Sequence, residues 1–312
     1  MKERITPHLR ALIDAGSEAI KNQFVKMRGK NTKKKFPTLD PLEEEKYSPT
    51  KGLVHKYKRT ALIKVSNYCA GHCQFCTRCR DIGTPEGDLS KEDIKNIITY
   101  VEKHTEIVEI ILSGGDPFFT PNVTYELLDK LDSIKSVRVI RIGTRLPVHA
   151  PRSFKQRNVL DVLEKIEAIN RFRCPVHVLI HFNHPDEITK EVSDLMWDLR
   201  RTGVVLFSQT VFLRDVNDNV DILDKLFMKL HSLGVIPYYI YRCDYVAGRE
   251  HFVVPFMREV RIMIALWKRL PGLALPQYIF DAPGGKGKIR VPYLSRQIPR
   301  SFADTEGKTI EI

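Results

Sequence analysis

The amino-acid sequence predicts an α/β fold in which six strand–helix units build a parallel sheet that closes only part of a barrel. Two observations lead to this prediction. Short runs rich in β-branched and aromatic residues alternate along the chain with segments of helical periodicity. The strand segments are also apolar almost without interruption, as expected for strands that are buried on both faces.

Each element has its own local signal. The predicted strands cover 61–65, 107–113, 137–143, 175–182, 204–211 and 235–241. The predicted helices cover 90–103, 123–133, 155–168, 187–202, 218–232 and 255–269. In the first helix, Ser90 is a favourable N-cap, and the residues that share one helical face are Ile94, Ile97, Ile98 and Val101.

Composition places the chain among ordinary globular proteins. The 312 residues are 43% hydrophobic and 28% charged, which is enough to bury a sizeable core. The sequence contains no signal peptide and no apolar run long enough for a membrane span. We therefore expect a cytoplasmic protein, whose clustered cysteines serve metal or redox chemistry rather than disulfides.

The net charge is +12, and it leaves several partners open. A solvated basic surface, a nucleic acid or an anionic small ligand would each be compatible with this charge. Residues 21–35 hold seven basic side chains and no acidic one, but they lack the interleaving of aromatic and basic residues that is typical of stacking on nucleic-acid bases. We predict that this stretch is a surface segment ahead of the main fold.

The chemically unusual residues follow the ends of the predicted strands. The cysteines follow the first strand, "SGGDP" (113–117) the second, "GTR" (143–145) the third and "HFNHP" (181–185) the fourth. Gln209 lies late in the fifth strand, and Asp244 follows the sixth. Because active sites of parallel α/β folds lie at this edge of the sheet, we predict that the protein is an enzyme.

The cysteine-rich stretch "CAGHCQFCTRC" favours an iron–sulfur cluster. Cys69, Cys73 and Cys76 form a C-x3-C-x2-C pattern, and Cys79 adds an overlapping C-x2-C-x2-C pattern. Structural zinc would require four ligands, usually from two paired knuckles, and the remaining Cys174 and Cys243 are isolated. A cubane cluster binds cysteine thiolates, and three of them leave one iron open for another ligand.

The C-x3-C-x2-C pattern after a first strand resembles the radical S-adenosylmethionine (SAM) superfamily. The resemblance implies a partial (β/α)6 TIM-like barrel of the radical SAM type with an N-terminal helical extension. It implies a 4Fe-4S cluster on Cys69, Cys73 and Cys76, with Cys79 as a bystander. SAM would chelate the open iron, with the aromatic Phe75 near its adenine and the strand-two motif Gly114, Gly115 and Asp116 at its amino group.

A longer series of motifs resembles the lysine 2,3-aminomutase family. These motifs run in order from Leu53 to about Pro292 and are "VHKY", "CAGHCQFCTR", "ILSGGDP", "RIGTRLP", "HFNHPDEIT", "SQTVFLRDVNDN", "CDYVAGREHF" and "DAPGGKGK". The resemblance implies that pyridoxal 5′-phosphate (PLP) is bound to Lys288 at the end of the glycine-rich loop. Lys286 stands where the family has glycine. The resemblance also implies phosphate contacts by Lys56, Arg59 and Arg145, and SAM contacts by His181 and Gln209.

The same resemblance implies the substrate groups. Arg78 matches the arginine that binds the substrate carboxylate, as its two-pronged donor geometry allows. Asp244 and Asp281 match the two aspartates that hold the side-chain ammonium of lysine. We therefore expect an isomerase, a lysine 2,3-aminomutase that moves the α-amino group to the β-carbon. Arginine or another cationic amino acid is the second substrate choice.

Two other functions stay open from the sequence alone. One is a PLP-free radical SAM enzyme that acts on nucleic acid, and the other is an iron–sulfur scaffold without catalysis. For the aminomutase we expect a small amino acid substrate, an external one-electron reductant and a possible homo-oligomer, without a membrane. The expected organisation is an N-terminal helical and basic extension (1–59), the partial barrel (60–275) and a PLP-lysine loop with C-terminal tail (276–312).

Overall fold

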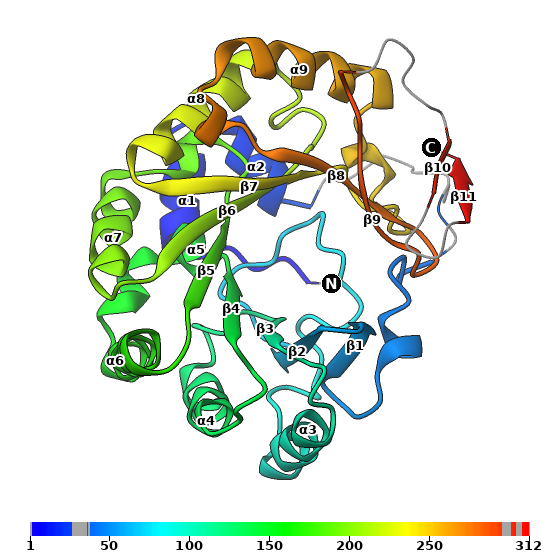
Figure 1. The fold of residues 1–312 in the computed structure, drawn as a ribbon. Helices are drawn as coiled ribbons and strands as arrows, with labels where there is room; N and C mark the ends of the chain where they lie inside the picture. The colour runs from blue at the N-terminus through cyan, green and yellow to red at the C-terminus, as the bar shows by residue number, and fades with distance from the viewer. Residues whose placement is uncertain (1, 27–35, 37, 295–300, 304–307, 312) are drawn as a thin grey trace.

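A nine-stranded sheet forms the centre of the fold, and its strands follow one another in chain order from β1 to β9 (Figure 1). The computed structural model describes residues 2–26, 36, 38–294, 301–303 and 308–311. Strands β2 to β8 are parallel, while β1 and β9 are antiparallel strands at the two edges. The strands are β1 (Leu53–Tyr57), β2 (Thr60–Ser66), β3 (Glu109–Gly114), β4 (Val139–Thr144), β5 (Val176–His181), β6 (Val205–Val211), β7 (Val235–Tyr241), β8 (Gln277–Ala282) and β9 (Gly287–Arg290).

Helices connect the parallel strands and cover the outer face of the curled sheet (Figure 1). They are α3 (Lys91–Lys103), α4 (Pro121–Asp132), α5 (Leu146–His149), α6 (Arg157–Phe172), α7 (Lys190–Arg201), α8 (Val220–Ser232) and α9 (Phe256–Arg269). Local signals fix their starts: Ser90 and Asp93 form a capping box on α3, and Asn219 caps α8. The predicted partial barrel of strand–helix units is confirmed.

The sheet is buried differently on its two faces. In β3, Ile110 and Leu112 are fully buried in the core beneath the helices, whereas Ile111 and Ser113 on the other face are half-buried. The continuous apolar strands had predicted burial on both faces. The inner face instead lines a cavity, and polar residues such as Arg141 of β4 enter the strands there.

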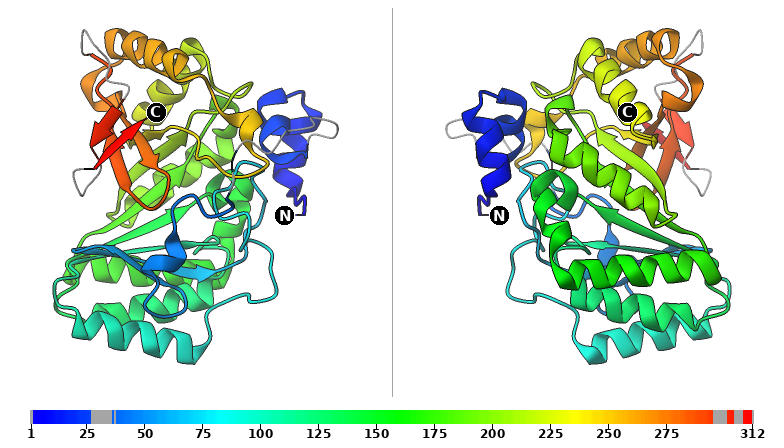
Figure 2. Two further views of the ribbon diagram at one scale, coloured as in Figure 1. Left: turned by 90° about the vertical axis from the view of Figure 1, so that its right-hand side faces the viewer. Right: turned by 90° about the vertical axis from the view of Figure 1, so that its left-hand side faces the viewer.

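The N-terminal segment forms two short helices, α1 (Pro7–Asp14) and α2 (Glu18–Phe24). They contact α5 and the 3-10 turn Pro185–Glu187, which follow the carboxyl ends of β4 and β5 (Figure 2). The predicted N-terminal helical extension is therefore present and covers this end of the barrel. Residues 27–35 of the basic segment lie outside the described residues.

The sheet continues across both boundaries that the sequence suggested. Strand β1 precedes residue 60, and β8 and β9 follow residue 275, yet all three pair within the same sheet. These boundaries therefore do not separate independent sheets. Strands β10 (Ser301–Ala303) and β11 (Thr309–Glu311) pair with each other in a small second sheet. None of the helices in the described part of the chain is long and apolar enough to span a bilayer.

Candidate active site

A cavity of about 390 Å³ lies on the inner side of the curled sheet and gathers residues from most of the sequence motifs. The predicted site residues that line it are Cys73, Phe75, Cys76, Arg78, His181, Gln209, Asp244, Asp281 and Lys288. An overlapping pocket of about 130 Å³ adds Lys56 beside Arg78, Asp281 and Lys288. We call the loop with Cys69, Cys73 and Cys76 the cysteine end, and the group of Lys56, Asp281 and Lys288 the lysine end.

The cysteine end follows β2 and carries three partly buried thiols. Burial raises the pKa of Cys69, and the charges of Asp116, Cys76 and Cys73 raise it further. Burial likewise raises the pKa of Cys76 to about 12. Thiols in such surroundings ionise readily only beside a strong positive charge, which bound iron provides. The donor set therefore fits a metal cluster.

The thiols do not converge on a single ion. Within the part of the chain that the structure describes, no three His, Cys, Asp or Glu side chains are grouped to hold one metal ion. Separate thiolates suit the separate irons of a 4Fe-4S cluster, each of which takes its own cysteine. Cys79 is also free and is more deeply buried than the three predicted ligands.

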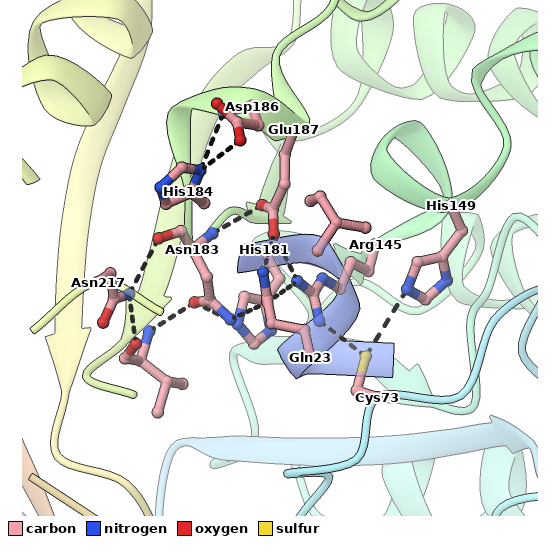
Figure 3. Close-up of polar contacts among 12 residues, drawn as sticks. Gln23, Cys73, Arg145, His149, His181, Asn183, His184, Asp186, Glu187 and Asn217 are labelled. Atoms are coloured by element: carbon pink, nitrogen blue, oxygen red, sulfur yellow. Dashed lines mark hydrogen bonds and ion pairs between the residues drawn. The ribbon is translucent and has the colours of Figure 1, made fainter. Parts of the chain in front are cut away.

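Arg145 belongs to the cysteine end rather than to the lysine end (Figure 3). One guanidinium nitrogen donates to Cys73 Sγ over 2.8 Å, and another pairs with Glu187 over 2.9 Å. The same nitrogen that pairs with Glu187 also donates to Gln23 Oε1 of helix α2 over 2.6 Å. This position does not support the predicted phosphate contact of Arg145, because both of its Nη groups bind partners beside the cysteines.

The buried network around Arg145 joins four segments of the chain (Figure 3). Glu187 is fully buried, accepts from Gln23 Nε2 over 2.8 Å and accepts from the backbone N–H of Asn183 over 2.7 Å. Asn183 in turn contacts His181 Nε2 over 3.0 Å. Because buried charges must be paired and hydrogen-bonded, this network holds the N-terminal helix α2 to the carboxyl end of β5.

The motif Gly114, Gly115 and Asp116, at the carboxyl end of β3, shapes the edge of the sheet beside the cysteines. Gly114 has a φ of +99°, and a Cβ on Gly115 would lie 2.2 Å from the carbonyl oxygen of Tyr68. Glycine is therefore required at both positions. Asp116 is buried and accepts from Thr144 Oγ1 over 2.8 Å and from the Arg145 N–H over 2.7 Å. Its carboxylate thus ties the ends of β3 and β4 together and is not among the cavity lining.

The structure brings the other predicted SAM residues together at the cavity wall. Phe75, His181 and Gln209 all line it, and the rings of Phe75 and His181 are 5.6 Å apart. Gln209 is the register partner of His181 across β5 and β6. Burial lowers the pKa of His181 well below its usual value, so this imidazole is neutral at physiological pH.

Lys288 is placed by the hairpin of β8 and β9. Asp281 and Lys288 are directly opposed in the antiparallel register, and Lys288 Nζ lies 2.7 Å from Asp281 Oδ2. The turn between the strands contains Gly284 and Gly285 in the left-handed region, which explains the glycine-rich sequence. Loss of surrounding water works against the charge of Lys288, but Asp281, Tyr241 and Tyr57 together outweigh it and raise the pKa of this lysine.

Strand β1 supplies the facing side of the lysine end. Burial lowers the pKa of Lys56, which senses the charges of Asp281 and Lys288. The neighbouring Tyr57 lines the cavity, and its buried hydroxyl lies near the Lys288 backbone without a hydrogen bond of normal geometry to a described residue. An orphaned donor beside a lysine fits a polar ligand such as PLP. Arg59 is exposed in the turn before β2 and is not brought to this group.

Asp244 lies between the two ends, where Thr77 Oγ1 donates to its Oδ2 over 2.6 Å. Burial and the charge of Asp281 raise the pKa of Asp244 to about 7. Within the described chain, no Lys, Arg or His side chain forms an ion pair with Asp244. The two aspartates therefore form a region of the cavity that attracts a cation.

Arg78 pairs with Glu44, the first residue of the 3-10 turn Glu44–Tyr47 that precedes β1. Nε donates to Glu44 Oε2 over 3.0 Å, and Nη2 donates to Oε1 over 2.5 Å. Both side chains are mostly buried, with 21% of Arg78 and 10% of Glu44 exposed. Arg78 is thus held by a charge-assisted pair at the wall of the cavity.

Several residues at the site escaped the sequence analysis. They are Gln23, Glu44, Tyr57, Thr77, Arg141 and Tyr241. Thr77 directly follows Cys76 in the cysteine-rich motif, so its place in the sequence could have identified it as a site residue. Gln23 and Glu44 come from the N-terminal segment, and no spacing or composition connected them to the cavity.

The half-barrel and the three-cysteine loop define the class of this protein, the radical SAM superfamily, and the model of that superfamily matches residues 63–227. A solved radical SAM methyltransferase from Sphaerobacter thermophilus superposes with a TM-score of 0.52 at 16% identity. It covers 73% of this chain and 68% of that one.

The chain belongs to the lysine 2,3-aminomutase family. It is 37% identical to an L-lysine 2,3-aminomutase of Methanococcus maripaludis, over 92% of this chain and 65% of that protein. It is 34% identical to one of Fusobacterium nucleatum, over 96% of this chain and 70% of that protein. A glutamate 2,3-aminomutase of Clostridioides difficile is 33% identical over 88% of this chain and 64% of that protein. The chain thus spans about two thirds of the length of these curated relatives.

Proposed function

We propose that this chain is an isomerase that moves the α-amino group of L-lysine to the β-carbon. One observation carries the proposal: Arg78, Asp244, Asp281 and Lys288 line the same cavity as Cys73 and Cys76. A guanidinium and two carboxylates can bind the two charged ends of one lysine molecule. The relatives named for lysine support the choice.

The cofactors that the proposal requires are a 4Fe-4S cluster, SAM and PLP. When bound, the cluster and SAM supply hydrogen abstraction by one-electron chemistry, and PLP carries the migrating amino group. Cys69, Cys73 and Cys76 would hold the cluster. Gly114, Gly115, Phe75, His181 and Gln209 would surround SAM. Lys288 would anchor PLP, with Lys56 and the Tyr57 hydroxyl as polar contacts.

The protein itself supplies position and exclusion of water. Arg78 binds the substrate carboxylate through a guanidinium edge, while Asp244 and Asp281 bind the side-chain ammonium. In the ligand-free protein, Asp281 is paired with Lys288. If Lys288 holds PLP, this carboxylate would be available to a substrate cation. The curled sheet and the N-terminal helices enclose the reacting atoms and keep them from solvent.

The carboxylates of Asp244 and Asp281 also disfavour glutamate as the substrate. A glutamate side chain would bring a second carboxylate toward Asp244 and Asp281, and like charges at this distance repel. The name of the Clostridioides difficile relative therefore does not transfer to this chain under the proposal. Arginine is the second substrate choice, because its guanidinium can also pair with two carboxylates.

The test is anaerobic turnover with SAM, PLP and dithionite, on lysine, arginine, ornithine and glutamate in parallel. We expect the β-amino product from lysine to form fastest. A clear preference for glutamate would contradict the substrate assignment. If none of the four amino acids reacts although the cluster and PLP are loaded, the aminomutase proposal fails and nucleic acid becomes the substrate class to test.

A further inference from the structure

Glu44 holds only one edge of the Arg78 guanidinium. The pair uses Nε and Nη2, which form the lateral edge of the planar group. No described residue accepts a hydrogen bond from Nη1. A guanidinium can bind two carboxylates at once through two different edges, because its five N–H donors point outward in one plane. The edge formed by Nη1 and Nη2 is therefore left for a second carboxylate.

Glu44 is itself held firmly. Its backbone N–H donates to Asp40 Oδ1 over 3.2 Å, and Ser48 Oγ donates to its carbonyl oxygen over 2.8 Å. Asp40 in turn pairs with Arg80 over 2.6 Å. The segment from Asp40 to Ser48 thus binds two arginines of the loop that follows the cysteines. Such anchoring suits a fixed support better than a side chain that must leave.

The charge of Glu44 persists at neutral pH. Burial would raise the pKa of this carboxyl, but the surrounding cations, with Arg78 foremost, together outweigh burial and lower it. Lys64 and Arg80 act in the same direction. Glu44 is also part of the wall of the overlapping pocket that contains Lys56, Asp281 and Lys288. It is therefore an ionised side chain directly beside the proposed substrate.

We propose that Glu44 is a positioning residue for substrate recognition, which fixes the Arg78 guanidinium so that its Nη1–Nη2 edge meets the carboxylate of the amino acid. The inference rests on the proposed function, in which Arg78 binds that carboxylate. Glu44 then acts only through Arg78, and its effect is restricted to ligands that carry a carboxylate. Misplacement of a binding group by about 1 Å costs up to roughly a hundredfold, so we expect a ten- to hundredfold effect.

The experiment compares lysine with 1,5-diaminopentane, which has both amino groups of lysine and lacks the carboxylate. PLP-loaded enzyme is titrated with each ligand, without SAM or reductant, and the absorbance of the pyridoxal chromophore reports binding. For Glu44→Gln we expect about ten- to hundredfold weaker binding of lysine and less than about twofold change for the diamine. Glu45→Gln is the matched control, because Glu45 is 79% exposed and should change neither affinity.

A double-variant cycle tests whether Glu44 acts through Arg78. In an Arg78→Met background, adding Glu44→Gln should weaken lysine binding no further. If Glu44→Gln lowers PLP loading, Glu44→Asp is measured in the same way. It keeps the charge, shortens the reach and should still weaken lysine binding selectively.

Three outcomes would overturn the inference. Tighter binding of lysine in Glu44→Gln would make Glu44 a competitor of the substrate rather than a support for Arg78. Equal weakening of lysine and the diamine would indicate a general effect on the pocket. Unchanged lysine binding would remove any role in recognition. By contrast, if lysine leaves the chromophore of the unmodified enzyme unchanged, the proposed function itself fails.

Discussion

The cysteine end and the lysine end of the cavity are built in opposite ways. The three cysteines of one end lie within eight residues of a single loop. The lysine end is assembled from β1, β8 and β9, which are far apart along the chain and lie at both edges of the sheet. A site carried by one loop can be recognised from its spacing, whereas a site assembled by the fold becomes visible only in three dimensions.

The two ends also differ in charge. At the cysteine end, the positively charged Arg145 is buried against Cys73 and Glu187. Toward the lysine end, Lys288 and Arg78 each have a carboxylate partner, while the Asp244 carboxylate accepts from the Thr77 hydroxyl and has no ion-pair partner among the described residues. Under the proposed function, one end would hold a cluster, and the other would bind a substrate that brings a cation and an anion.

The largest expected effect is a loss of function at the lysine end that leaves the cysteine end intact. Lys288→Ala should abolish PLP anchoring and turnover while the iron content stays unchanged, because Lys288 makes no contact with the cysteines. Mass spectrometry after borohydride reduction, together with iron analysis, measures both. Lys286→Ala is the control and should retain the phosphopyridoxyl adduct. An adduct on Lys286 in the unmodified protein would reverse the assignment.

The second effect concerns the cation region. Asp244→Asn or Asp281→Asn should reduce turnover of lysine by roughly a few hundredfold or more. Loss of one partner of a buried ion pair costs on the order of 3–5 kcal/mol, and about 1.4 kcal/mol corresponds to a factor of ten. Asp194→Asn on the surface of α7 is the control. Full activity in both variants would exclude these carboxylates from lysine binding.

A smaller effect, about a tenfold change in lysine affinity per pH unit below the pKa, should follow from the titration of Asp244. Its pKa rises from 3.8 to about 7 in the folded protein, so it must lose a proton before it pairs with a cation. Lysine binding should therefore strengthen as the pH increases toward about 7 and then level off. In Asp244→Asn this dependence should disappear, and its persistence would assign it to another group.

The raised pKa of Asp244 also affects the stability of the folded protein, which falls with increasing pH whereas lysine binding strengthens. Between about pH 4 and 7 the folded state keeps a proton on Asp244 that the unfolded state has lost. Stability of the ligand-free protein therefore decreases as the pH rises through this window. Denaturant unfolding of the unmodified protein and Asp244→Asn, at pH 5 and pH 7, isolates this contribution.

The smallest effect is expected at the cysteine end, for the substitution of Cys79. Cys79→Ala should leave iron content and turnover unchanged, because the proposed cluster uses Cys69, Cys73 and Cys76. Cys76→Ala is the matched variant and should lose the iron. Equal loss of iron in the two variants would favour the overlapping pattern of Cys73, Cys76 and Cys79.

Much of the fold was predictable because hydrophobic periodicity is a local property. All six predicted strands and six predicted helices are present, with ends displaced by a few residues. Strands β1, β8 and β9 were not predicted. β1 and β9 are short edge strands that gain stability from pairing rather than from their own pattern. β8 lies inside the sheet and is almost fully buried, and the sequence analysis did not assign its apolar run to a strand. The motif "GTR" placed Arg145 directly after the third predicted strand, which is β4, but could not show where its side chain points. Its burial beside Cys73 and Glu187 depends on Gln23, more than 100 residues earlier.

The strand order of the sheet also bears on how the enzyme is made. Each strand pairs with its neighbour in the sequence, from β1 to β9, so the sheet can extend as the chain leaves the ribosome. The cysteine loop follows the first parallel strand, whereas Lys288 arrives only with β9, more than 200 residues later. A partly synthesised chain can therefore present the proposed cluster ligands but not the lysine proposed to anchor PLP. Under the proposed function, radical chemistry on an amino acid becomes possible only when the fold is complete.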